Sequence, residues 1–258
     1  MRVVIKVGTS SLTHKSGHLN VRKVEAMCKV LSDLKNAGNE IILVSSGAIA
    51  MGVGKLNLTE RPTDVPTKQA MAAVGQCELM YIYDKLFSEY NHTVAQILIT
   101  MDDIKSERRH INFQNTMNRL LELGTLPIIN ENDTVSFEEF GIGDNDTLSA
   151  FVAVSINADL LILLSDIDGL YTADPHKDPN ARLIPVIDKI DDSVISVAGG
   201  AGSARGTGGM KTKISAALTV TENGTDMIIT NAANIDGLYD IFDGKSVGTR
   251  FIGKKENK

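Results

Sequence analysis

A glycine-rich segment followed by two lysines carries the strongest chemical signal in the sequence. It reads Gly206-Thr207-Gly208-Gly209-Met210-Lys211-Thr212-Lys213 and leads into a stretch with helical periodicity. Backbone amides at a helix N-terminus attract anions, whereas lysines at the same position are opposed by the helix dipole. An anion held between the amides and the lysines would compensate for that opposition. The segment therefore favours a phosphate-binding loop over a glycine stretch that provides flexibility alone.

Two earlier segments are consistent with the same chemistry but leave an alternative open. Lys6 ends the first apolar run, and Gly8 follows it, where a missing side chain would let a phosphate approach the backbone. The alternative is a solvated lysine beside an ordinary turn. Ser46 precedes Gly47 in a run of small residues that predicts a helix N-terminus, which either binds an anion or is simply capped by serine.

Acidic and amide side chains follow the later apolar runs. Asp133 comes after the fourth run, and Asn145 and Asp146 lead into a predicted helix. These side chains could bind the ammonium or amide groups of a polar substrate, or they could cap a helix and a turn. A metal cage is the weaker interpretation, because the spacing of a calcium-binding loop is absent. Ser165 and Asp166 follow the fifth run, where an acid either binds a ribose hydroxyl or forms part of a turn.

The elements that must position these side chains alternate between two hydrophobic periods. Short β-branched runs predict buried strands at Arg2–Val7, Glu40–Val44, Val94–Ile99, Leu126–Asn130, Leu160–Leu164 and Met227–Thr230. Helical periodicity predicts helices over Val21–Leu34, Thr67–Ser88, Arg108–Leu123, Thr147–Asn157 and Lys211–Glu222. We therefore expect an α/β fold, a three-layer αβα sandwich with a mostly parallel central sheet. Ligands bind beyond the carboxyl ends of the strands in such sheets, which is where the polar segments lie.

Composition excludes several classes of protein. The 258 residues fit one large domain, and 43% apolar with 22% charged residues is ordinary globular composition. The net charge of −6 gives no cationic field for nucleic acid or for a membrane surface. Cys28 and Cys77 belong to no metal-binding pair, and no apolar run is long enough to span a bilayer. The motifs of dinucleotide-binding proteins, serine hydrolases and zinc proteases are absent. We expect a cytoplasmic protein without its own metal ligands.

Taken together and in order, the polar segments resemble those of the amino acid kinase family. The segments are KVGTSS, SSGAIAMG, NENDTV, GDND, LLSDIDGLYTADP and GTGGMKTK. The resemblance spans Val3 to about Gly253, and within the family the set is similar to the glutamate 5-kinase (γ-glutamyl kinase) group. Many members of that group carry a C-terminal PUA domain, whereas this sequence stops at Lys258. The expectation is a single amino acid kinase domain over residues 1–258, a short form without a PUA domain.

The resemblance implies a reaction and a set of site residues. The γ-phosphoryl group of ATP would pass to the side-chain carboxylate of L-glutamate, giving L-glutamyl 5-phosphate in the first step of proline biosynthesis. ATP would be the co-substrate, with Mg²⁺ bound mainly through the phosphates. The implied catalytic residues are Lys6, Lys213 and Asp146, with Asp146 between the lysines, and the implied glutamate contacts are Ser46, Asp133 and Asn145. The implied nucleotide contacts are Lys6, Gly8, Ser165, Asp166, Thr207, Gly208, Gly209, Met210, Lys211, Thr212 and Lys213.

The same resemblance implies partners and leaves alternatives. Free proline would inhibit by competing with glutamate, and the loop Glu138–Gly143 would respond to it. A homo-oligomer (dimer or tetramer) and channelling to glutamyl-phosphate reductase are implied as well, with no nucleic acid or membrane partner. One alternative is a related kinase acting on aspartate or N-acetylglutamate. The other is a non-catalytic sensor of a nucleotide or an amino acid.

Overall fold

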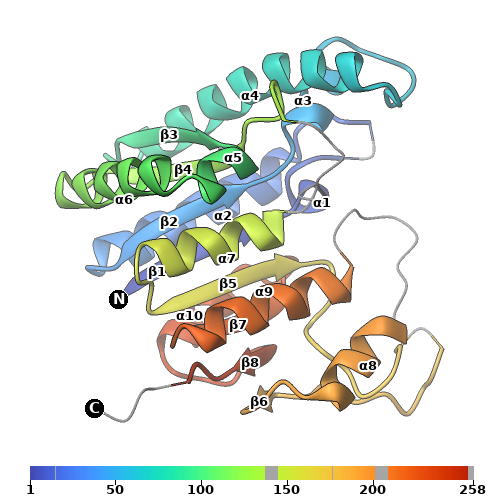
Figure 1. The fold of residues 1–258 in the computed structure, drawn as a ribbon. Coiled ribbons are helices and arrows are strands. Elements are labelled where there is room, and N and C mark those ends of the chain that lie inside the picture. Colours follow the sequence, from blue (N-terminus) through green and yellow to red (C-terminus); the bar gives the residue numbers. More distant parts are fainter. Residues whose placement is uncertain (15, 137–144, 176, 201–208, 255–258) are drawn as a thin grey trace. The chain divides into compact units, whose positions relative to one another are not determined.

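The computed structural model describes residues 1–14, 16–136, 145–175, 177–200 and 209–254. The chain divides into two compact units (Figure 1), each of which is treated by itself below. Unit 1 comprises Met1–Lys6 and Gly143–Lys258, and unit 2 comprises Val7–Ile142. The expectation of one kinase domain over residues 1–258 stays a prediction.

The strands of unit 2 are parallel. They are β2 (Glu40–Ser45), β3 (Val94–Ile99) and β4 (Leu126–Glu131), in the spatial order β3-β4-β2. Leu43 pairs with Ile128, and Val94 pairs with Leu126. β2 and β4 are buried along almost their whole length, as expected of strands that are apolar on both faces. The carboxyl ends of β2 and β4 therefore lie at the same edge of this part of the sheet.

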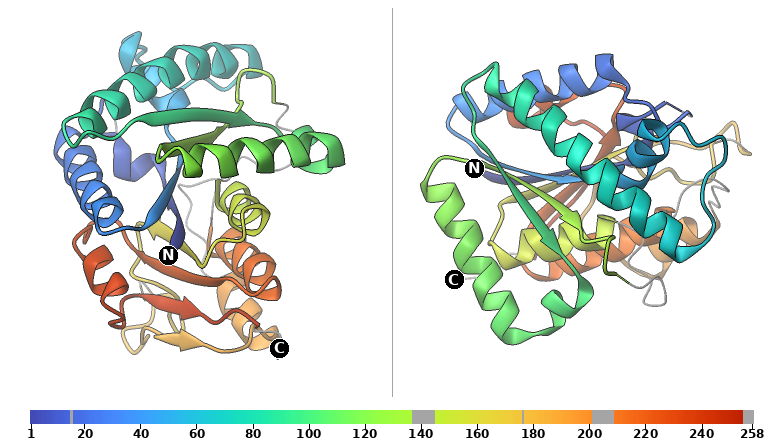
Figure 2. Two further views of the ribbon diagram at one scale, coloured as in Figure 1. Left: turned by 90° about the vertical axis from the view of Figure 1, so that its left-hand side faces the viewer. Right: turned by 90° about the horizontal axis from the view of Figure 1, so that it is seen from above.

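The helices of unit 2 cover both faces of these strands. They are α1 (Thr9–Leu12), α2 (Val21–Asn36), α3 (Ala48–Lys55), α4 (Val65–Ser88), α5 (Met101–Lys105) and α6 (Glu107–Glu122). Figure 2 shows α2 and α4 on one face and α6 on the other. α4 begins two residues before its predicted start, because Asp64 accepts a hydrogen bond from the Thr67 amide and Pro66 suits the first turn.

Two glycines allow α3 and α4 to pack closely. A Cβ atom at Gly75 would lie 1.8 Å from the Ala48 carbonyl oxygen, and one at Gly52 would lie 2.0 Å from the Met71 carbonyl oxygen. Both distances are far inside van der Waals contact, so any side chain at either position would force the helices apart. The close crossing fixes α4 against the helix that follows β2.

The strands of unit 1 are mostly parallel but include one antiparallel pair. They are β1 (Arg2–Val7), β5 (Leu160–Ser165), β6 (Val186–Ile187), β7 (Asp226–Asn231) and β8 (Thr249–Phe251), in the order β1-β5-β7-β8-β6. β5 and β7 pair in parallel, whereas β7 and β8 are antiparallel. The sequence predicted β1, β5 and β7 but not β6 or β8, because two or three residues are too few to show a period.

The helices of unit 1 also lie on both faces of the strands of their own unit. They are α7 (Asn145–Ser155), α8 (Asp192–Gly200), α9 (Met210–Glu222) and α10 (Gly237–Phe242). α7 and α9 lie side by side on one face of the strands, and α10 lies on the other (Figure 2). The predicted α/β class, with mostly parallel strands and helices on both faces, is confirmed.

Candidate functional site

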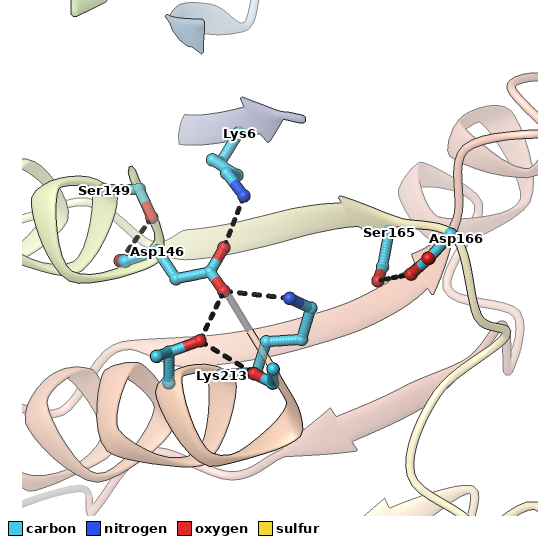
Figure 3. A network of polar contacts seen from close by, with 8 residues as sticks. Lys6, Asp146, Ser149, Ser165, Asp166 and Lys213 are labelled. Atoms are coloured by element: carbon cyan, nitrogen blue, oxygen red, sulfur yellow. Dashed lines mark hydrogen bonds and ion pairs between the residues drawn. The ribbon is translucent and has the colours of Figure 1, made fainter. Parts of the chain in front are cut away.

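Three charged side chains of unit 1 form a buried ion-paired cluster (Figure 3). The Nζ atom of Lys6 lies 2.6 Å from Oδ1 of Asp146, and Nζ of Lys213 lies 2.9 Å from Oδ2 of the same carboxylate. The side chains of Lys6, Lys213 and Asp146 are 9%, 8% and 0% exposed. Asp146 therefore lies between the two lysines, as the motifs implied, and Lys6 is not a solvated lysine.

The sequence brings the three residues together from three elements. Lys6 lies near the end of β1, Asp146 in the first turn of α7, and Lys213 in the first turn of α9. A carboxylate is favourable at a helix N-terminus, whereas the lysine is not. The sequence analysis predicted an anion that compensates for lysines at the N-terminus of this helix. The Asp146 carboxylate is in part that anion. Lys211, by contrast, is exposed.

Thr212 adds a neutral contact to the cluster. Its hydroxyl lies 3.1 Å from Oδ2 of Asp146 and 2.7 Å from the carbonyl oxygen of Gly209, so its one proton can be donated to either acceptor. The hydroxyl of Ser149 donates to the main-chain oxygen of Asp146 at 2.7 Å. These bonds hold Asp146 in place and connect it to the turn that begins α9.

The electrostatics of the cluster favour a bound anion. Burial opposes ionisation of Asp146, but the positive charges of Lys6 and Lys213 outweigh it and lower the pKa of this carboxyl. Two lysine ammonium groups and one carboxylate leave a surplus of one positive charge among the three side chains. A buried cationic surplus at a helix N-terminus is suited to a phosphate group.

The other nucleotide residues implied for unit 1 lie at the ends of two elements. Ser165 is the buried last residue of β5, and its hydroxyl donates to the exposed Asp166 carboxylate at 3.2 Å. Gly209 is the N-cap residue of α9, and Met210 begins that helix. Thr207 and Gly208 lie outside the described residues.

In unit 2, two implied residues begin turns that follow strands. Gly8 is the N-cap residue of the short helix α1. Ser46 follows β2, and its amide donates to the Val7 carbonyl oxygen at 3.1 Å. Gly47 has a φ of 102°, a left-handed conformation that favours glycine at the N-cap of α3. Ser46 and Gly47 therefore help to form the turn before α3, in addition to the binding role predicted for Ser46.

Asp133 lies in a turn after β4, in an acidic environment. Burial raises the pKa of Asp133 to about 6. Burial, and after it the charge of Asp133, raises the pKa of Glu131 to about 7, against the opposing effect of a hydrogen bond with Ser136. The turn is closed by hydrogen bonds from the Val135 and Ser136 amides to the Asn132 carbonyl oxygen, each 3.1 Å long. Both carboxyls are held where a bound cation would stabilise their ionised forms.

The third implied glutamate contact, Asn145, is the buried first residue of α7 and belongs to unit 1. Ser46 and Asp133 belong to unit 2. The sequence analysis also missed two buried polar residues of unit 2, Gln76 and Asn130. The available signal was a glutamine within the apolar face of a helix and an asparagine at the end of a buried strand.

Outside the undescribed segments, no group of three or more His, Cys, Asp or Glu side chains is placed to hold a metal ion. Among the helices of the described residues, none has the length and apolar character to cross a bilayer.

Comparison with known proteins identifies the family. A sequence model described as "Amino acid kinase family" matches residues 1–231, which is most of the chain. The chain belongs to the amino acid kinase family. The resemblance drawn from the motifs is confirmed.

Curated relatives within the family are similar over nearly their whole length. The chain is 54% identical over 255 residues to "Glutamate 5-kinase" of Clostridium acetobutylicum, covering 99% of this chain and 96% of that protein. It is 50% identical over 258 residues to "Glutamate 5-kinase" of Clostridium perfringens, covering 98% of this chain and 96% of that protein. The similarity to the glutamate 5-kinase group is confirmed at this level of identity.

Solved structures confirm the fold. UMP kinase from Ureaplasma parvum matches with a TM-score of 0.67 and 16% identity, over 97% of this chain and 98% of that chain. Isopentenyl phosphate kinase from T. acidophilum matches with a TM-score of 0.67 and 18% identity, over 97% of this chain and all of that chain (100%). At these identities the likeness concerns the fold alone, which is the expected amino acid kinase fold.

Proposed function

We propose that this protein transfers the γ-phosphoryl group of ATP to the side-chain carboxylate of L-glutamate, giving L-glutamyl 5-phosphate for proline biosynthesis. The observation that carries the proposal is the identity of 50–54% to proteins named glutamate 5-kinase, over nearly the full length of both chains. The buried Lys6–Asp146–Lys213 cluster supports it, because phosphoryl transfer requires positioned positive charge.

The chemistry needs no general base. A carboxylate is ionised and nucleophilic at neutral pH, so the barrier comes from bringing an anion to a polyanion. Lys6 and Lys213 would offset that repulsion, and Asp146 would hold both ammonium groups in place. Mg²⁺, bound mainly through the phosphates of ATP, would neutralise part of the phosphate charge.

The remaining residues take binding roles in the proposal. In unit 1, Ser165, Asp166 and the segment from Thr207 to Lys213 would bind ATP, and Asn145 would bind glutamate. In unit 2, Gly8 would offer its amide to phosphate, whereas Ser46 and Asp133 would bind glutamate. Asp133 is suited to the ammonium group of an amino acid, because a cation beside a half-buried carboxyl favours its ionised form.

A coupled assay of ADP release tests the proposed function directly. The purified chain is supplied with ATP, Mg²⁺ and L-glutamate, L-aspartate or N-acetyl-L-glutamate in separate reactions. We expect the highest kcat/KM with L-glutamate, together with a product that hydroxylamine traps as a hydroxamate. A preference for either of the other acids would reassign the substrate, and no turnover with any of them would favour a sensor.

We further propose that free proline inhibits by competing with glutamate. Proline carries an α-carboxylate and an adjacent amino group, so the groups that hold glutamate can hold it. The implied loop Glu138–Gly143 lies outside the described residues. Raising glutamate at fixed proline should relieve the inhibition, and raising ATP should not. No inhibition at millimolar proline, or inhibition indifferent to glutamate, would contradict this proposal.

The assembly and the partner enzyme complete the proposal. We propose a homo-oligomer, a dimer or a tetramer, which light scattering of the purified protein would measure. Acyl phosphates hydrolyse readily, so direct transfer of glutamyl 5-phosphate to glutamyl-phosphate reductase is proposed as well. A competing trap for free acyl phosphate would fail to intercept the product if transfer is direct.

A further inference from the structure

Helix α4 presents three polar side chains at intervals of seven residues. They are Gln69, Gln76 and Tyr83. Seven residues correspond to about two turns of an α-helix, so the three side chains lie along one face. Gln76 and Tyr83 are buried, and Gln69 is half-buried. Polar side chains are costly on a buried face unless each has a hydrogen-bond partner.

Each of the three side chains bonds to the end of β2, to the end of β4 or to the turn that follows β4. The Tyr83 hydroxyl lies 2.8 Å from the Ser45 hydroxyl, next to Ser46. Asn130 donates from Nδ2 to Oε1 of Gln76 at 2.8 Å. Gln69 donates from Nε2 to the carbonyl oxygen of Ser136 at 3.2 Å. One helix face thus holds the ends of two strands and the turn 131–136.

The contact at Gln76 fixes an orientation. Asn130 is 2% exposed, and while its Nδ2 donates to Gln76, its Oδ1 accepts from the Glu131 amide at 2.9 Å. A rotated Asn130 amide would place an oxygen against the Gln76 oxygen and a donor against the Glu131 N–H. The bond to Gln76 therefore orients the Asn130 side chain, whose Oδ1 bonds the main chain as it leaves β4 toward Asp133.

Close packing against α3 also restricts the position of α4. The Cβ-free surfaces of Gly52 and Gly75 let α3 and α4 touch through their backbones, and Gly75 is the neighbour of Gln76. The close contact between the two backbones limits the movement of α4 at this point. Gln76 is consequently a rigid support for Asn130.

We propose that Gln76 is a positioning residue for the amino acid substrate: through Asn130, it holds the turn 131–136 so that Asp133 meets the substrate in one orientation. The proposal rests on the proposed function in one respect, namely that Asp133 binds the amino acid substrate. In this role the Gln76 side chain acts through Asn130 and contacts no substrate atom itself. Gln69 supports the far end of the same turn.

The variant Gln76→Met tests the proposal, since methionine has a similar length and lacks the strong acceptor. We expect the KM for the amino acid to rise about tenfold, equivalent to about 1.4 kcal/mol. The kcat and the KM for ATP should stay within about twofold. The matched control is Thr225→Val, which removes a buried hydroxyl bonded to the Ala158 carbonyl oxygen at 2.9 Å in unit 1. It should lower the unfolding temperature without changing either KM.

A double-variant cycle separates positioning from simple destabilisation. If Gln76 acts through Asn130, adding Gln76→Met to Asn130→Ala should raise the dissociation constant of the amino acid, measured by calorimetry, no further. Additive effects, or an unchanged KM in Gln76→Met, would overturn the proposal.

A third variant keeps the proposal testable if Gln76→Met does not fold. Gln69→Ala should then raise the amino acid KM about twofold to threefold, and an unchanged value would overturn the proposal. Failure of the proposed function would be recognised separately, as wild-type protein that turns over another acid. The selective KM effect would then be measured with that acid.

Discussion

The two units differ in how their buried charges are compensated. In unit 1, Lys6 and Lys213 share the carboxylate of Asp146, and the pKa of that carboxyl is lowered despite its burial. In unit 2, Glu131 and Asp133 are two acids close together, and burial raises the pKa of each. One group of side chains is thus charged and internally paired, whereas the carboxyls of the other group take up protons at a higher pH than such groups ordinarily do.

This difference indicates what each group is suited to receive. A paired cluster with a surplus positive charge keeps its geometry without a ligand and attracts phosphate. Half-buried acids with raised pKa values gain most from an incoming cation, such as the ammonium group of an amino acid. The comparison therefore supports the proposal that the Lys6–Asp146–Lys213 cluster serves phosphate chemistry and that the acidic turn 131–136 serves amino acid recognition. The following changes would break or sharpen that comparison.

The largest effect is expected from Lys213→Ala. Removing a cation that acts on the transferring phosphoryl group should lower kcat by about a hundredfold to a thousandfold, with a smaller change in the KM for glutamate. The control is Lys245→Ala, which removes an exposed lysine paired with Asp240 at 2.6 Å. Near-wild-type turnover in the folded Lys213 variant would contradict the assignment of Lys213 as a catalytic lysine.

A change in unit 2 should act on substrate binding. Asp133→Ala should raise the KM for glutamate about tenfold or more, because it removes the group proposed to meet the ammonium, and leave the KM for ATP nearly unchanged. The control is Asp102→Ala, at an exposed position of α5 in the same unit. Equal increases in both KM values would contradict a role for Asp133 that is specific to the amino acid.

A smaller effect is expected from Thr212→Val. The substitution removes the hydroxyl that contacts Asp146 but leaves both ion pairs, so kcat should fall about fivefold, since loss of this hydrogen bond is expected to cost about 1 kcal/mol. Thr219→Val is the control, because Thr219 lies on the same helix and its hydroxyl donates only to the Ser215 carbonyl oxygen. An unchanged kcat in the Thr212 variant would show that the two lysines suffice to hold Asp146.

The smallest effect concerns stability and pH. The pKa of Asp133 is about 6 in the folded protein, against an ordinary 3.8, so the folded state holds more protons than the unfolded state between these values. The free energy of unfolding from this group therefore falls as pH rises through that window. Asp133→Asn does not ionise and should unfold a few degrees higher than wild type at pH 7.5, with the difference shrinking toward pH 5.

Bound glutamate should restore part of the stability that is lost as pH rises. Its affinity is expected to rise as pH increases through about 6, because the ionised form of Asp133 is the one that binds an ammonium group. Calorimetry in buffers of different ionisation enthalpy would detect the accompanying proton release below pH 6. A pH-independent affinity between pH 5 and 8 would separate Asp133 from substrate binding.

Much of the fold was predictable because the longer elements carry a clear period. Six strands were predicted within one residue of their observed ends, and α2, α4, α6, α7 and α9 within about two. The strands β6 and β8 were missed because two and three residues are too few to show alternation. The polar residues at the strand ends could also be recognised in the sequence, but the contacts between their side chains could not.

The sequence by itself determined the class of fold, the family and the residue types at the strand ends, since these depend on local periodicity and on contiguous motifs. Only the tertiary structure decided that Lys6 is buried rather than solvated, and that Asp146 bonds both lysines. It alone revealed the bond between Asn130 and Gln76, residues 54 positions apart. The physical reason is that burial and hydrogen bonding depend on distances between segments remote in the chain, which no local pattern encodes.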